Sequence, residues 1–197
     1  MNAQQPGQID ASAVEAAANE FAAGDDEMRA YRQLHAATRL LRAGIALPAA
    51  YALAEKARDG IKDALGVPAA TVAAQADEYY EIRAKAIASG GTPDVPEAPR
   101  QALSDIMTGR IEDLSGWILF NQDRPAAAIE YLKRAVSVLP ENTPSWRTAL
   151  WHLGAALDQT GNREEALSYY IRSYNSGEPD SVRRSVIEQL YRKVNGS

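Results

Sequence analysis

Two histidines are the side chains of this sequence best suited to acid–base or metal chemistry. His35 and His152 fall in separate predicted helices, where a lone histidine is more often a core or surface residue than a base or a ligand. The sequence has no cysteine, which rules out disulfides, thiolate nucleophiles and zinc–thiolate sites. It also has no phosphate-binding glycine loop, no HExxH or GxSxG motif and no carboxylate cluster beside a histidine. We therefore predict no catalytic residue, no metal site and no cofactor.

The charged runs have structural interpretations. The acidic run at 25–27 suits the start of a helix, where negative charge complements the macrodipole. The basic pairs at 183–184 and 192–193 are expected on a solvated face. The net charge of 21 − 26 = −5 provides no basic field for nucleic acid or an anionic membrane. An unrecognised hydrolase or transferase is the rival hypothesis, which a deep polar pocket that gathers His35 or His152 with carboxylates would favour.

Helices must position these residues. The chain of 197 residues suits one domain or two small ones, and its excess of alanine is typical of closely packed helices. No segment alternates with the period of a strand. The stretch 69–89 is expected to be one helix, with Val72, Ala76, Tyr79 and Ala86 on one side. In full, helices are predicted over 12–23, 25–44, 48–66, 69–89, 99–121 with a break at Gly109, 124–138, 145–159, 163–175 and 179–194.

The second half of the chain contains an internal repeat. Its matching positions are Gly116, Ala128 and Pro140 in the first copy and Gly154, Ala166 and Pro179 in the second. The glycine and the alanine both return after 154 − 116 = 166 − 128 = 38 residues. A fixed period of this length indicates stacked helical units, in which small residues let the two helices of a pair approach closely.

The second copy resembles the tetratricopeptide repeat family, with leucine where that family prefers tryptophan and tyrosine in the first helix. The residues that carry the resemblance are Leu150-x2-Leu153-Gly154-x2-Leu157, Ala166-x3-Tyr170 and Pro179. The first copy keeps Gly116, Ala128, Leu132, Ala135 and Pro140 in register, but has Glu112, Ser115 and Leu119 where Trp, Leu and Tyr are expected. The resemblance covers about 110–179, and the helix at 179–194 resembles the helix that caps such arrays. A generic antiparallel helical bundle is the alternative.

The resemblance implies an all-α fold, a right-handed α–α superhelix of helix hairpins. We expect a polar N-terminal arm at 1–10, N-terminal helices at 11–109 with a Gly/Pro linker at 90–99, and two repeat-like pairs with a capping helix at 110–197. The segment 26–66 is either a degenerate copy of the same unit or a set of independent helices that pack on the array. The small residues Thr38, Ala50, Ala54 and Ala57 favour the first interpretation.

In this family the first helix of each pair lines a concave groove that binds peptides or partner proteins. Carried onto this chain, the family spacing selects Asp113, Trp117, Phe120, Trp151, Asp158 and Gln159 as a partner-binding groove. The alternative is that the N-terminal helices or a neighbouring subunit fill the groove and make these aromatic residues ordinary core. The clamp for a C-terminal carboxylate found in some members is absent, because Asp113, Trp117, Trp151 and Ala155 occupy its positions.

We therefore predict a non-enzymatic protein–protein interaction or scaffold module with a protein or peptide partner, and neither nucleic acid binding nor membrane insertion. The alternative is a structural subunit that self-assembles head-to-tail into a homo-oligomer or filament, because helical arrays have two open ends. The first ten residues contain no basic start and no apolar run. This favours the cytoplasm for the chain as written, and the periplasm or the extracellular space if Met1 replaces a removed signal peptide.

Overall fold

The computed structural model describes residues 10–64, 68–92, 99–177 and 180–196. Most of the predicted N-terminal arm, the centre of the Gly/Pro linker, Gly66 and Pro179 lie outside these ranges. The described residues form ten helices and no strand. They are α1 (Ala11–Phe21), α2 (Arg29–Ala43), α3 (Leu47–Ala64), α4 (Pro68–Glu78), α5 (Tyr80–Ala88), α6 (Arg100–Asn121), α7 (Pro125–Val138), α8 (Pro144–Gln159), α9 (Arg163–Asn175) and α10 (Ser181–Asn195).

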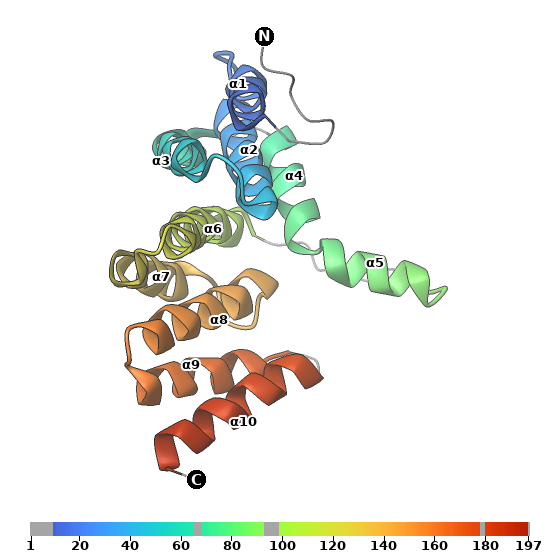
Figure 1. Ribbon diagram of the computed structural model, residues 1–197. Helices are drawn as coiled ribbons and strands as arrows, with labels where there is room; N and C mark the ends of the chain where they lie inside the picture. The colour runs from blue at the N-terminus through green and yellow to red at the C-terminus, as the bar shows by residue number, and fades with distance from the viewer. Residues whose placement is uncertain (1–9, 65–67, 93–98, 178–179, 197) are drawn as a thin grey trace.

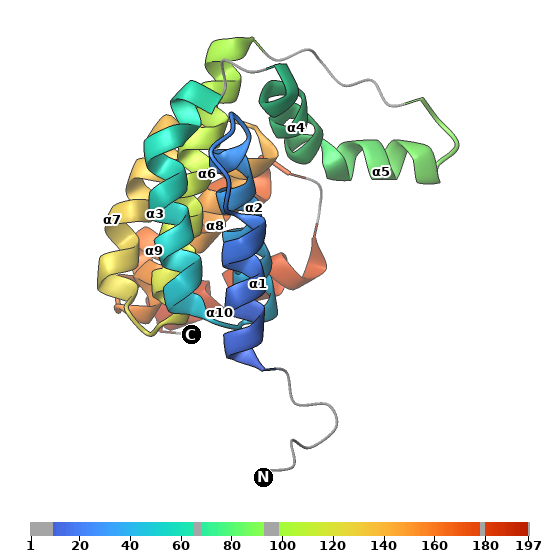
Figure 2. The ribbon, with the colours of Figure 1, turned by 90° about the horizontal axis from the view of Figure 1, so that it is seen from above.

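The helices pack as sequential pairs, α2 with α3, α6 with α7 and α8 with α9. Helix α1 lies on α2, α10 lies on α9, and Figure 1 shows the elements stacked in order from α1 at one end to α10 at the other. Helices α4 and α5 interrupt this order, and α5 extends away from the stack (Figure 2). The predicted all-α fold of helix hairpins is thereby confirmed.

Two glycines let the helices of a pair approach closely. A Cβ atom on Gly116 would lie 2.7 Å from Cγ of Leu132 in α7, and one on Gly154 would lie 2.8 Å from Cδ1 of Tyr170 in α9. Both distances are below van der Waals contact, so a side chain at either position would push the two helices apart. The 38-residue spacing of these glycines therefore reflects the same helix contact made twice.

Three helix predictions are wrong. The helix expected from residue 25 begins at Arg29 as α2, after a turn in which Asp26 accepts a hydrogen bond from the N–H of Met28. Helix α6 continues through Gly109, where Leu139 fills the space that a side chain would need. The segment 69–89 is not one helix, because it divides at Tyr79 into α4 and α5, and Val72 on the expected packed side is 66% exposed. The division follows directly after Glu78, which is buried and bonded to Ser145 of α8. The position of this break therefore follows a contact between distant segments and not the local spacing of apolar residues.

The N-terminal hairpin stacks directly on the repeat region. Ala50, Ala54 and Ala57 of α3 are fully buried, and α3 packs against α6. Helix α6 runs without interruption across the proposed boundary between 109 and 110. The division into an N-terminal and a C-terminal part stays a proposal.

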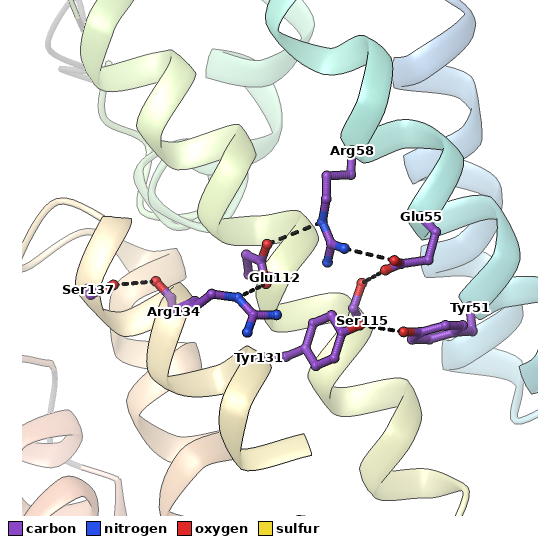
Figure 3. Close-up of polar contacts among 8 residues, drawn as sticks. All are labelled: Tyr51, Glu55, Arg58, Glu112, Ser115, Tyr131, Arg134 and Ser137. Carbon is purple, nitrogen blue, oxygen red and sulfur yellow. Dashed lines mark hydrogen bonds and ion pairs between the residues drawn. The ribbon is translucent and has the colours of Figure 1, made fainter. Parts of the chain in front are cut away.

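A group of polar side chains, called here the polar joint, links α3 to α6 and α7 (Figure 3). Glu112 of α6 is only 9% exposed, and its carboxylate lies 3.2 Å from Nε of Arg58 and 2.9 Å from Nε of Arg134. Both guanidinium groups also lie against the ring of Tyr131, at 5.2 and 4.4 Å from its centroid. The joint is completed by Tyr51, Glu55 and Ser115.

Candidate functional site: the concave groove

The first helices of the three pairs face a single cavity of about 1130 Å³. Helices α2, α6 and α8 line it, together with residues from α4–α5, the end of α9 and the start of α10. Because α6 lies between α2 and α8 in the stack, it is the central helix of this groove (Figure 1). A cavity of this size can accept several residues of a bound chain.

Three stacked rings form the aromatic part of the groove. The ring of Trp117 lies parallel to that of His152, with centroids 3.9 Å apart, and Phe120 covers the opposite face at 4.5 Å. The carboxylate of Asp113 lies 2.9 Å from Nδ1 of His152 and so orients the imidazole. Trp117 and His152 both line the cavity. Because both faces of its ring are covered, Trp117 presents the edge of a preorganised indole to the groove.

The four carboxylates of the cavity wall all have partners. Asp77 accepts a hydrogen bond of 2.6 Å from the Tyr31 hydroxyl and lies 3.4 Å from Arg110. Burial and the neighbouring carboxylate raise the pKa of Tyr31 well above its usual range, so this hydroxyl keeps its proton and donates. Asp113 is paired with His152.

Glu78 and Asp180 cap helices. The carboxylate of Glu78 accepts hydrogen bonds from the backbone N–H and the hydroxyl of Ser145, in the first turn of α8. Asp180 accepts from the backbone N–H of Val182 and of Arg183 at the start of α10. Negative charge at a helix N-terminus is stabilising, which gives both carboxylates a structural role.

Several cations of the cavity wall lack a carboxylate partner. Arg39 and Arg42 of α2 form no ion pair and no side-chain hydrogen bond within the described residues, and both are exposed. Arg147 of α8 donates only to the backbone carbonyls of Asn142 and Ser176 in the part of the chain that the structure describes. The groove therefore presents unneutralised positive charge although the chain as a whole carries −5.

The six predicted groove residues divide into two sets. Asp113 and Trp117 line the cavity, whereas Phe120, Trp151, Asp158 and Gln159 do not. Phe120 supports Trp117 from behind, as described above. The role of the six predicted residues in binding a partner stays a prediction.

The other three predicted residues, Trp151, Asp158 and Gln159, contact α9 or the turn that follows α6. The ring of Trp151 packs on Tyr170 of α9 at 4.4 Å and lies under the guanidinium of Arg183 at 5.0 Å. Asp158 is 3.9 Å from Nε of Arg163, beyond the following turn. The amide of Gln159 donates to Asp123.

The sequence did contain a signal for the arginines of α2. Thr38 and Gly116 are 116 − 38 = 78 residues apart, and the same offset places His35, Arg39 and Arg42 at the positions of Asp113, Trp117 and Phe120. All three of these α2 residues line the cavity. His152 could not be found in this way, because it follows Trp151, the residue one period beyond Asp113.

Comparison with known proteins identifies one repeat. Residues 114–142 match the family model of the tetratricopeptide repeat, and this range spans the last eight residues of α6 and all of α7. Neither the search of curated proteins nor that of solved structures gave a match. In the described part of the chain, no helix is long and apolar enough to cross a bilayer, and no group of histidine and carboxylate side chains has the arrangement of a metal site. One tetratricopeptide repeat match therefore lies within the α6–α7 hairpin, on which the groove is centred.

Proposed function

We propose that this protein is an interaction module whose concave groove binds an acidic segment of a partner protein. A tetratricopeptide repeat suggests a protein-binding role, and here the matched segment includes the end of α6, the central helix of the groove. The proposal keeps Trp117 as a contact residue, and gives Asp113 and Phe120 the roles of holding the His152 and Trp117 rings.

The imbalance of charge in the groove carries the proposal. Its carboxylates are engaged by Tyr31, Arg110, His152, Ser145 and the start of α10, so they offer little to a cationic ligand. Arg39 and Arg42 are three residues apart on α2 and share one face of the helix. A carboxylate of the ligand can pair with them without displacing an existing partner.

The aromatic stack supplies the second part of the recognition. Trp117 is half-buried on the next helix of the groove, α6, and its ring is already fixed between His152 and Phe120. Tryptophan and arginine are the side chains that most often dominate binding energy at protein interfaces. We expect the bound segment to combine acidic residues with at least one apolar side chain.

Selection of random peptides displayed on phage against the immobilised protein tests the proposal. We expect the selected peptides to be acidic, and their synthetic forms to bind more weakly as the salt concentration rises. In the variant Arg39→Glu/Arg42→Glu, we expect fluorescence anisotropy to show binding weaker by about tenfold or more, because carboxylates would then face carboxylates.

The matched control is Lys56→Glu/Arg124→Glu. It makes the same change of charge at two exposed residues that lie outside the groove and have no ion pair within the described residues. The proposal fails if the selected peptides are not acidic, or if both double variants bind an acidic peptide as the wild type does.

The pairing of His152 with Asp113 is the one observation that favours an enzyme. A carboxylate that orients a histidine is two thirds of a hydrolytic triad, but no hydroxyl of the described residues is bonded to this imidazole. The cavity serines, Ser145 and Ser173, donate instead to Glu78 and to the carbonyl of Arg147. Equal rates of ester hydrolysis by the wild type and by His152→Gln would eliminate this candidate.

A further inference from the structure

The N-terminal end of the stack is acidic. Residues 10–27 contain six carboxylates and no lysine or arginine, and all six are exposed. Asp25 and Asp26 pair with Arg29 and Arg32 of α2. The others, which include Glu15 and Glu20 on α1, have no cationic partner among the described residues.

The same end is incompletely covered. No residue of α1 is fully buried, and Phe21 in its last turn is 51% exposed although it touches the ring of His35. A terminal helix of a repeat array normally presents a polar outer face to water. Here the face of α1 turned away from α2 combines alanines with negative charge.

The opposite end of the stack has the opposite charge. Helix α10 carries four basic residues and one acidic residue, Glu188, which pairs with Arg184 at 2.9 Å. Arg192 and Lys193 in the last turn are exposed and have no ion pair in the described part of the chain. Val182 and Tyr191 on this helix are also exposed, at 73% and 55%.

We propose that α1 of one molecule docks on the outer face of α10 of a second copy, so that the chain assembles head-to-tail. Helices α1 and α10 lie at opposite ends of the stack (Figure 1), so a contact between them joins different surfaces and leaves one free end on each side. The carboxylates of Glu15 and Glu20 face the cations of Arg192 and Lys193. The alanines on the outer face of α1 are buried in the same contact. This inference uses neither the groove nor its ligand.

Charge reversal at each end tests the inference. Glu15→Lys/Glu20→Lys puts a basic pair on α1, and Arg192→Glu/Lys193→Glu puts an acidic pair on α10. We expect the mass of the wild type to grow with concentration in sedimentation velocity. Each variant alone should have an association constant lower by about tenfold or more. Mixing the two variants must restore assembly, because each acidic end then meets a basic end.

The control Lys56→Glu/Arg124→Glu must assemble as the wild type does. Circular dichroism establishes that every variant is folded, and the single changes Glu20→Lys and Lys193→Glu serve if a double variant is not. A wild type that stays monomeric at all concentrations overturns the inference. A dimer that grows no further, or an equimolar mixture of variants that stays monomeric, overturns it as well.

Discussion

The stack contains two joints between successive hairpins, and they are built differently. Between α3 and the α6–α7 pair, a buried apolar cluster that includes Leu53, Met107 and Ile111 is accompanied by the polar joint. In the polar joint, Glu112 is shared by Arg58 and Arg134 (Figure 3). Between the α6–α7 pair and α8 the contact is apolar. Its fully enclosed residues are Ala135, Leu139, Trp146, Ala149 and Leu150.

The difference separates two ways of joining repeat units. An apolar contact gains stability roughly in proportion to the area that it buries and tolerates small shifts of one helix on the other. A buried carboxylate between two guanidinium groups gains little net stability. It fixes the orientation of one helix on the next, since any shift of the helices leaves a charge unpaired. We infer that the apolar contacts of both joints supply most of the stability and that the polar joint sets how the N-terminal hairpin meets α6.

The largest effect is expected at the apolar joint. Leu150 is fully buried, so Leu150→Ala leaves a cavity and should lower the free energy of unfolding by about 3 kcal/mol. Urea denaturation followed by circular dichroism measures it. The control is Val182→Ala, at an exposed position where a change of less than about 0.5 kcal/mol is expected. Similar losses from both substitutions would contradict the assignment of the core.

A smaller effect is expected at the polar joint. Glu112→Ala leaves the guanidinium groups of Arg58 and Arg134 without their shared carboxylate and should cost about 2 kcal/mol, because half of Arg134 is still in water. A second variant, Glu112→Leu/Arg58→Leu, removes the buried charges together. We expect it to be more stable than Glu112→Ala in the same urea titration. Equal instability of the two variants would show that the charges are not what the joint depends on.

The smallest effect concerns the hydroxyl pair of the polar joint. The hydroxyls of Tyr51 and Tyr131 are 2.5 Å apart, so Tyr51→Phe removes one hydrogen bond, worth about 1 kcal/mol. Burial and the bond to Tyr131 raise the pKa of Tyr51 to about 12.

This raised pKa makes the effect depend on pH. Between about pH 10, where an unfolded tyrosine ionises, and about pH 12, only the unfolded state loses the Tyr51 proton. The contribution to stability is therefore complete below pH 10 and is lost as the pH rises toward about 12. Thermal melts across this range should decline more steeply for the wild type than for Tyr51→Phe. Parallel curves would mean that this hydroxyl does not titrate differently on folding.

Local sequence signals predicted most of the helices. Gly44 ends α2 in the left-handed conformation, and Thr143 accepts from the N–H of Trp146 at the start of α8. These are contacts within one turn, which residue type and spacing encode directly. The spacing of Gly116 and Gly154 was equally informative, because each glycine meets the helix that follows it in the chain.

Contacts between distant segments were not predictable in this way. The break at Tyr79 follows Glu78, whose partner Ser145 is 67 residues away. Gly109 inside α6 makes room for Leu139, which lies at the end of α7, the other helix of the same pair. In the groove, the period of 38 predicts Trp151 opposite Asp113, yet His152 lies there, because Trp151 packs on Tyr170. One position along a helix turns a side chain by about 100°, which only the packing of α8 decides.

The central claim is that the concave groove is where a partner protein binds. Nuclear magnetic resonance titration of the labelled protein with an acidic peptide selected on it tests this most directly. We predict shifts of the Trp117 indole N–H signal and of backbone signals around Arg39 and Arg42, with saturation at one peptide per chain. Shifts confined to the outer faces of α1 and α10, or to α3 and α7, would contradict the claim.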